Sequence, residues 1–296
     1  SKHMPNIQVS KDVSLYYEDK GHRSAPVIIL IMGLGAQMTV WPDSLYFGLI
    51  EKGYRVIRFD NRDVGLSSQL NELGTPNLLK TWLSKHLSLK ANIPYQLDDM
   101  AKDVVCLMRA LKIKRAHLVG ASMGGMIAKI IASKHKKKVL SLTSLMSTSS
   151  YQAMPRPKLK VLLQLANRPA KSSREAAIRY NVKLNRLIGS PAFPTDEEVL
   201  QQQAQLNVTR AYHPDGFKRQ LIAVTQSANK PKLLKKIKAP TLVIHGTADP
   251  IIPMSSGQQT ATHIRKAKLK LIEGMGHDFP PQLMQKLTKL ITKHTH

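Results

Sequence analysis

Two kinds of apolar pattern alternate along the chain. Residues 27–31 (Val-Ile-Ile-Leu-Ile) form an unbroken run rich in β-branched side chains, which is typical of a strand buried on both faces. In residues 97–111 the apolar positions instead recur every three to four residues, which predicts a helix with one apolar face. Because strand-like and helix-like segments follow each other in turn, the pattern predicts βαβ units around a mostly parallel sheet.

The same patterns locate the other elements. Strands are expected at residues 7–9, 13–17, 27–31, 54–59, 116–119, 139–146, 241–244 and 268–272, the first two as a hairpin. Helices are expected at residues 42–52, 97–111, 123–134 and 282–293. The predicted fold class is therefore α/β, with a mostly parallel central sheet flanked by helices.

The alternation stops between residues 149 and 230, where helical patterning continues without a clear strand. A loop of this length without structure of its own would be unusual in a compact domain. We therefore expect an inserted helical cap at 149–230, between a first part of the α/β core at 1–148 and a second part at 231–296. Within this cap, Thr195 is expected to be the N-cap of a helix, because Glu198 follows at capping-box spacing.

The composition indicates a globular protein with a sizeable core. The 296 residues are 42% hydrophobic and 22% charged, which excludes wholesale disorder. The longest uncharged apolar run, residues 25–36, is well short of the ~20 residues that span a bilayer, so no membrane insertion is expected. A single cysteine suits a reducing compartment, and we expect a cytoplasmic location.

The balance of charge is strongly basic. The chain has 45 Lys and Arg against 19 Asp and Glu, a net charge of +26, which attracts polyanions without specificity. The lysines are nevertheless mixed with apolar residues at helical or strand spacing, and residues 134–138 are the only dense cluster. Since the chain has no motif for nucleic-acid recognition, we interpret the charge as a solvated surface and expect no specific nucleic-acid partner.

The first chemical motif is Gly-Ala-Ser-Met-Gly-Gly at residues 120–125, between an expected strand and an expected helix. This is the G-x-S-x-G pattern in the context of a nucleophile elbow, in which a sharp turn exposes the serine at the carboxyl edge of the sheet. The glycines allow strand and helix to approach closely, and the N-terminus of the helix stabilises developing negative charge. Ser122 is therefore a candidate nucleophile.

Two later strands are followed by residues suited to activate Ser122. Asp249 lies in the loop after residues 241–244, and His277 lies in the loop after residues 268–272. A neutral serine hydroxyl needs a base, which His277 would supply, while Asp249 would fix the tautomer of the imidazole and stabilise its protonated form. The chain order Ser, Asp, His is that of α/β hydrolases.

Other residues near these loops could serve either the packing of the fold or the binding of a substrate. Asp60, Arg62 and Asp63 follow a strand, and we interpret them as a structural polar network. The candidates for the wall of a substrate pocket are Met32, Trp41, Met275 and, in the cap, His213; core packing would explain the first three equally well. No His/Cys cluster has metal-ligand spacing and no G-x-G-x-x-G follows an early strand, so we expect no metal and no cofactor.

Together the motifs resemble the α/β-hydrolase superfamily, specifically the capped serine hydrolases related to aclacinomycin methylesterase. The resembling stretches are residues 30–42 (LIMGLGAQMTVWP), 59–67 (FDNRDVGLS), 120–125 (GASMGG), 240–250 (PTLVIHGTADP) and 274–280 (GMGHDFP). The resemblance is specific for the fold and the triad and much less so for the substrate. It also implies an oxyanion hole made by the backbone N–H groups of Leu34 and Met123, with Met32 where many relatives have a histidine.

The expected function is that of a serine hydrolase that cleaves a small or medium, apolar carboxylic ester through an acyl-enzyme intermediate, without a cofactor. Serine at the elbow argues against haloalkane dehalogenase and epoxide hydrolase chemistry, since those relatives carry aspartate there. Three alternatives stay open: an acyltransferase, perhydrolase or C–C bond hydrolase with the same triad; a ligand-binding signalling protein of the same fold with slow turnover; and a non-specific polyanion binder. The sequence leaves the oligomeric state open.

Overall fold

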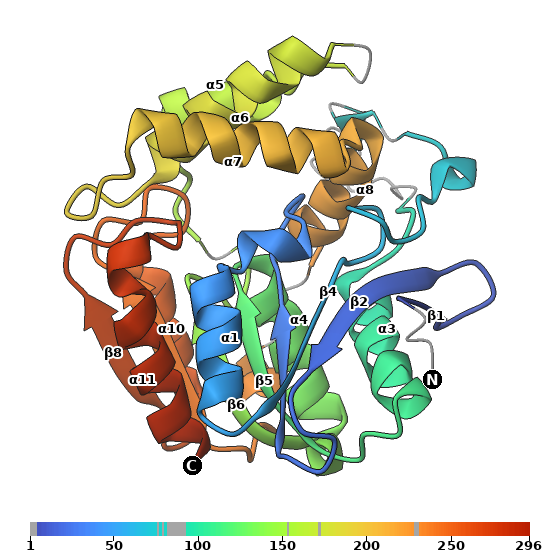
Figure 1. The fold of residues 1–296 in the computed structure, drawn as a ribbon, viewed down its shortest axis with the longest axis vertical. Helices are drawn as coiled ribbons and strands as arrows, with labels where there is room; N and C mark the ends of the chain where they lie inside the picture. The colour runs from blue at the N-terminus through green and yellow to red at the C-terminus, as the bar shows by residue number, and fades with distance from the viewer. Residues whose placement is uncertain are drawn as a thin grey trace.

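The computed structural model describes residues 5–75, 77–78, 80–81, 93–152, 154–170, 173–227 and 231–296. Its eight-stranded sheet has the order β1-β2-β4-β3-β5-β6-β7-β8 (Figure 1). The strands are β1 (Asn6–Gln8), β2 (Ser14–Lys20), β3 (Val27–Ile31), β4 (Arg55–Phe59), β5 (Ala116–Ala121), β6 (Val139–Leu145), β7 (Thr241–Gly246) and β8 (Lys268–Ile272). Only β1–β2 and β2–β4 pair antiparallel, which confirms the expected mostly parallel sheet.

Helices cover both faces of this sheet (Figure 1). On one face lie α1 (Asp43–Glu51) and α11 (Met284–Thr295). On the other lie α3 (Leu97–Ala110), α4 (Met123–Lys134), α9 (Pro231–Leu234) and α10 (Met254–His263). Short 3₁₀ helices occupy Met38–Val40, Asn71–Leu73, Lys136–Lys138 and Pro281–Leu283.

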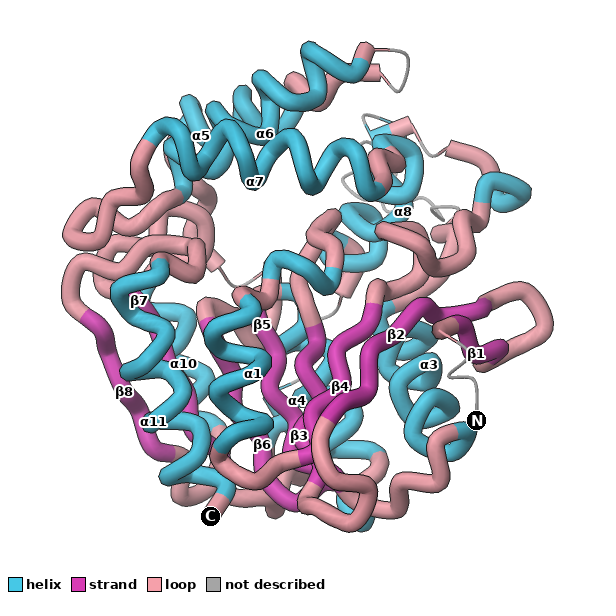
Figure 2. Tube along the Cα trace, in the orientation of Figure 1, coloured by secondary structure: helices cyan, strands magenta, loops and turns pink. Residues whose placement is uncertain are grey.

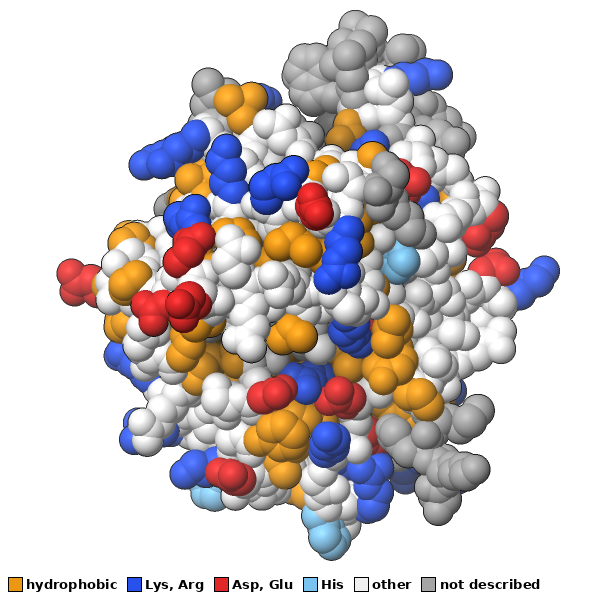
Figure 3. All heavy atoms as spheres, turned by 45° about the horizontal axis from the view of Figure 1, so that its top comes forward, with side chains coloured by type: hydrophobic (Ala, Val, Ile, Leu, Met, Phe, Trp, Pro, Cys, Tyr) orange, Lys and Arg blue, Asp and Glu red, His pale blue; other side chains and the backbone are white. Residues whose placement is uncertain are grey.

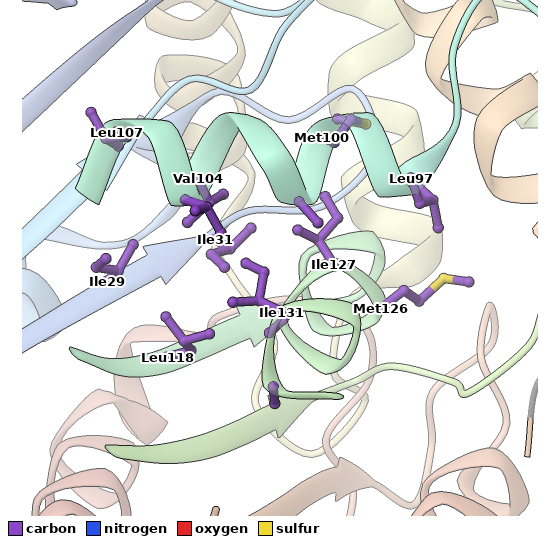
Figure 4. Close-up of a cluster of buried hydrophobic side chains, with 14 of the residues drawn as sticks. Ile29, Ile31, Leu97, Met100, Val104, Leu107, Leu118, Met126, Ile127 and Ile131 are labelled. Carbon is purple, nitrogen blue, oxygen red and sulfur yellow. The ribbon is translucent and has the colours of Figure 1, made fainter. Parts of the chain in front are cut away.

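The apolar run of β3 serves both faces at once. Val27, Ile29 and Ile31 belong to the core cluster beneath α3 and α4, whereas Ile28 and Leu30 belong to the cluster beneath α1 and α11. Because successive side chains of a strand point to opposite faces, a strand covered on both sides needs an unbroken apolar run. Figure 4 shows the first of these clusters, in which residues of α3 meet those of α4, β3 and β5.

Between β6 and β7 the chain leaves the sheet and forms α5 (Leu159–Ala166), α6 (Arg174–Ile188), α7 (Glu197–Arg210) and α8 (Pro214–Thr225), which we call the insert. Helices α5, α6 and α7 lie above the carboxyl ends of the parallel strands (Figures 1 and 2). Helix α8 joins the main core through Ala223 and Val224. The described part of the insert is mainly helical, and its role as a cap stays a prediction.

The first turn of α7 differs from the predicted one. Thr195 is not the N-cap, because the helix begins at Glu197 after Asp196, and no side chain caps it. Glu197, the first residue of the helix, is instead ion-paired with Arg186 of α6. The prediction was wrong because spacing along one segment carries no information about such a contact.

The surface in Figure 3, with the insert turned forward, shows Lys and Arg side chains scattered among acidic and apolar ones. On this face the Lys and Arg side chains are therefore spread out rather than gathered into one patch. Within the described residues, none of the helices combines the length and apolarity required to cross a bilayer.

Candidate active site

Ser122 occupies the sharp turn that joins β5 to α4. Its backbone has φ 54° and ψ −119°, a strained conformation for a residue with a side chain. A Cβ on Gly120 would lie 2.2 Å from the carbonyl oxygen of Gly124, and a Cβ on Gly124 would lie 1.9 Å from that of Ile31. Glycine is therefore required at both positions, and strand, strained turn and helix follow one another as in a nucleophile elbow.

Asp249 and His277 meet at the same edge of the sheet, in the loops after β7 and β8. The Nδ1 atom of His277 lies 2.8 Å from Oδ2 of Asp249. The other oxygen of Asp249 accepts hydrogen bonds from the backbone N–H groups of Ile251 and Ile252, each at 2.9 Å. Because the carboxylate only accepts, Nδ1 donates the proton, and Nε2 is left as the basic nitrogen.

Ser122 and the His277–Asp249 pair share an edge of the sheet because each follows the carboxyl end of a parallel strand. Among the described residues, no hydrogen bond joins Ser122 Oγ to His277. Catalytic hydrogen bonds are often long without substrate and tighten when it binds.

The charges around His277 favour its protonated form. Burial lowers the pKa of His277, but the negative charge and hydrogen bond of Asp249, with the charge of Asp278, outweigh this effect and raise that pKa above its ordinary value. Burial also raises the pKa of Asp278, whose carboxylate accepts a hydrogen bond from Ser190 Oγ at 2.5 Å. The charge of Asp278 thus helps to raise the pKa of His277. The hydrogen bond from Ser190 ties Asp278 to the insert.

The loop after β3 lies directly against the elbow. A Cβ on Gly33 would be 3.0 Å from Ser122 Cβ and 3.6 Å from the backbone nitrogen of Met123. Within the described part of the chain, the backbone N–H groups of Leu34 and Met123 have no hydrogen-bond acceptor. Both N–H groups are therefore free to donate, and their role as oxyanion donors stays a prediction.

The insert holds this loop in place, which the sequence did not reveal. The N–H of Gly35 donates to Gln220 Oε1 of α8 at 2.8 Å, and Gln220 Nε2 donates to the carbonyl of Arg62 at 2.7 Å. Gln37 Nε2 donates to the carbonyl of Asn207 in α7 at 2.7 Å. These partners are more than 150 residues apart along the chain, so no local signal could have indicated them.

The insert also holds the loop that carries the histidine. The backbone N–H of His277 donates to the carbonyl of Ile188 at 2.8 Å, and that of Gly276 donates to Ser190 Oγ at 2.8 Å. A side chain on Gly276 would clash with the backbone of Ile188 and Gly189. The insert therefore contacts both loops of the candidate site.

The candidates for the pocket wall fall into two groups. Met32, Trp41 and Met275 are at most 3% exposed and belong to the core cluster beneath α1 and α11. His213 precedes α8, with Nε2 3.0 Å from the carbonyl oxygen of Gly65. The first three have core contacts, and the part that any of the four plays in a pocket stays a prediction. The described residues include no group of three His, Cys, Asp or Glu side chains placed to hold a metal ion.

The turn after β4 is a polar network, in agreement with its structural interpretation. Three buried or half-buried ion pairs radiate from it: Asp60–Arg210 at 2.8 Å, Arg62–Asp103 at 2.7 Å and Asp63–Arg219 at 2.9 Å. Arg210 and Arg219 belong to α7 and α8. The network therefore fastens the insert to the core beside the candidate site.

A buried lysine lies behind the elbow. Lys129 of α4 is 2% exposed, and its Nζ donates to Ser147 Oγ at 3.3 Å and to the carbonyl of Thr148 at 3.1 Å. Ser147 Oγ in turn donates to the carbonyl of Ser122 at 2.6 Å. Burial lowers the pKa of Lys129 to about 7.

Lys129 makes stability depend on pH in a defined direction. Between about pH 7 and the ordinary lysine pKa of about 10.4, the unfolded chain binds a proton that the folded chain has lost, so the free energy of unfolding rises with pH. We expect this rise to be about 2 to 4 kcal/mol larger in the parent than in Lys129→Met, measured by urea denaturation from pH 7 to 10. Lys137→Met, at an exposed position, is the matched control and keeps the parental slope. Equal slopes for both variants would contradict the prediction.

The chain belongs to the α/β-hydrolase fold family, whose model matches residues 26–281. Within that family it is similar to the rhodomycin D methylesterase DauP of Streptomyces sp. (strain C5), at 27% identity covering 99% of this chain and 98% of the relative. The corresponding enzyme DnrP of Streptomyces peucetius is 25% identical with the same coverage. The esterase EaEST from Exiguobacterium antarcticum shares the fold, with a TM-score of 0.76, 22% identity and coverage of 98% of each chain.

Proposed function

We propose that the protein is a serine hydrolase that cleaves a carboxylic ester of a small molecule through an acyl-enzyme intermediate. The observation that carries the proposal is the strained turn at Ser122 on the sheet edge that also holds His277, hydrogen-bonded to Asp249. The similarity to methylesterases supports an ester as the bond that is cleaved.

The first half of the reaction acylates the serine. Ser122 Oγ adds to the ester carbonyl carbon while its proton moves to His277 Nε2, and Asp249 stabilises the imidazolium. The N–H groups of Leu34 and Met123 bind the oxyanion, each contributing about 3 kcal/mol to the stability of the transition state. The intermediate collapses, the bond to the alcohol oxygen breaks, and this oxygen takes the proton from His277. The products are an acyl-enzyme and a free alcohol.

The second half restores the serine. A water molecule gives a proton to His277 Nε2 as its oxygen adds to the acyl carbon, and the same two N–H groups bind the oxyanion. Collapse releases the carboxylic acid, and Ser122 Oγ regains its proton from His277. The insert above the strand ends would act as a cap that selects the substrate. The apolar part of the substrate would lie on the side of the site that faces the core.

The pH dependence of ester hydrolysis tests the base. His277 must be neutral to accept a proton, so kcat/KM should rise with pH through its pKa and then level off. Because this pKa is raised, the midpoint should lie above 6.5, the ordinary value for histidine. The measurement is product acid formed from a short methyl ester between pH 5 and 9, at constant ionic strength.

Two variants identify the group that titrates. Asp278→Asn removes a negative charge that raises the pKa of His277, so the midpoint should fall by less than about one pH unit. His22→Gln changes an exposed histidine between β2 and β3 and should leave the midpoint in place. A flat profile with chemistry rate-limiting, or a midpoint that Asp278→Asn does not move, would contradict the assignment.

A further inference from the structure

Arg168, which follows α5 in the insert, is a cation without an acidic partner. The neighbouring arginines of the insert, Arg210 and Arg219, are each paired with an aspartate of the core. No Asp or Glu of the described residues forms an ion pair with Arg168, and the residues outside that part of the chain include neither type. Its positive charge is therefore not neutralised by a carboxylate of this chain.

Aromatic rings hold this guanidinium in a fixed place. Its central carbon lies 3.8 Å from the centroid of the Phe217 ring and 5.1 Å from that of the Tyr180 ring. Tyr212 donates its hydroxyl to the carbonyl of Pro169 at 2.5 Å, which fixes the next residue of the chain. The Nε atom of Arg168 is buried and has no hydrogen-bond partner within the described residues. A desolvated N–H without an acceptor is unfavourable, and a bound anion would relieve this.

The guanidinium also touches the loop that carries the candidate oxyanion donor. A Cβ on Gly35 would lie 3.4 Å from Arg168 Nη2 and 2.7 Å from Phe217 Cδ2, and Gly33 of the same loop lies against Ser122. Residues two apart span at most about 7 Å, so Nη2 is no more than about 17 Å from Ser122 Cβ. One small molecule is long enough to reach both.

We propose that Arg168 binds a carboxylate at the end of the substrate remote from the scissile bond. A guanidinium presents parallel N–H donors that match the two oxygens of a carboxylate. The preferred substrate class is then an ester with an apolar body and a terminal carboxylate, such as a half-ester of a dicarboxylic acid. This inference rests on the proposed esterase function.

Matched pairs of esters test this preference. Monomethyl esters of linear dicarboxylic acids with four to eight carbons are compared with methyl esters of monocarboxylic acids of equal length, by kcat/KM. For the best length we expect the carboxylate ester to be favoured about 10- to 100-fold, as for one charge-assisted hydrogen-bonded pair. In Arg168→Met the ratio should fall to about 1, and Arg168→Lys, which keeps the charge but not the planar fork, should give an intermediate ratio.

The net positive charge of the chain attracts any anionic substrate. A control must therefore separate this general attraction from binding at Arg168. Arg179→Met removes the same charge from an exposed position on α6 and should keep the parental ratio. A parental ratio at or below 1 for every chain length would overturn the proposal. So would an equal loss of the ratio in Arg168→Met and Arg179→Met.

A binding measurement separates this site from the esterase reaction. Glutarate, a dicarboxylate without an ester, should bind Ser122→Ala in calorimetry and should not bind Ser122→Ala/Arg168→Met. If glutarate binds in this way but no ester is cleaved, the anion site is supported and the proposed function fails. If esters are cleaved through Ser122 without a preference for carboxylate and glutarate does not bind, the esterase is supported and the role of Arg168 is overturned.

Discussion

Ser122→Ala should lower kcat for ester hydrolysis by about 10⁴- to 10⁶-fold, because the acyl-enzyme has no other oxygen on which to form. The fold should not change. Ser122 Oγ makes no hydrogen bond within the described residues, and alanine has the same Cβ in the same strained turn. The free energy of unfolding should therefore stay within about 0.5 kcal/mol of the parent value.

Covalent labelling gives the most direct measurement of this effect. A fluorophosphonate should add one adduct to the parent protein, seen by intact mass, and none to Ser122→Ala. Ser133→Ala is the matched control: Ser133 lies on α4, the helix that follows Ser122, and donates to the carbonyl of Ile130 at 2.9 Å. It should be labelled like the parent. An adduct on Ser122→Ala, or retained turnover in that variant, would disprove the mechanism.

The sheet could be predicted because its signals are local. An unbroken apolar run such as that of β3 permits few structures other than a strand covered on both faces. The positions of the candidate site residues could also be predicted from local signals. Once the strands are placed, Ser122, Asp249 and His277 each follow a strand end, and the carboxyl ends of parallel strands share an edge.

The contacts of the insert could not be predicted in this way. Gln220 and Arg168 are ordinary helix or loop residues by sequence, and their contacts with Gly35 depend on how the insert packs on the core. The wrong N-cap at Thr195 has the same origin, since Glu197 is engaged by Arg186 of another helix. A sequence pattern describes one segment, whereas these contacts join segments that lie far apart along the chain.

These contacts also limit how the insert can move. The loop after β3 is bonded to α7 and α8, and the histidine loop is bonded to the end of α6. Lifting the whole insert would break the hydrogen bonds that hold both the loop after β3 and the histidine loop.

Of the two ion pairs that Arg210 and Arg219 of the insert make with the core, Asp63–Arg219 is the more deeply buried. Both side chains are fully buried, and two hydrogen bonds of 2.9 Å join them. Asp63 also accepts hydrogen bonds from Tyr95 Oη at 2.7 Å and from the N–H of Leu70 at 2.8 Å. All acceptor positions of this carboxylate are thus used, as a buried charge requires.

Asp63→Asn should therefore destabilise the protein by about 3 to 5 kcal/mol, because it leaves the charge of Arg219 buried without its counter-ion. Asparagine suits the positive φ of 70° at this position, so backbone strain does not add to the effect. Urea denaturation measures the loss of stability. Asp63→Asn/Arg219→Met should recover part of it, since the double variant buries no unpaired charge.

The control is Arg186→Met, which breaks the exposed pair with Glu197 and should cost less than about 1 kcal/mol. If Asp63→Asn lost no more stability than this control, the buried pair would not be what fastens the insert to the core.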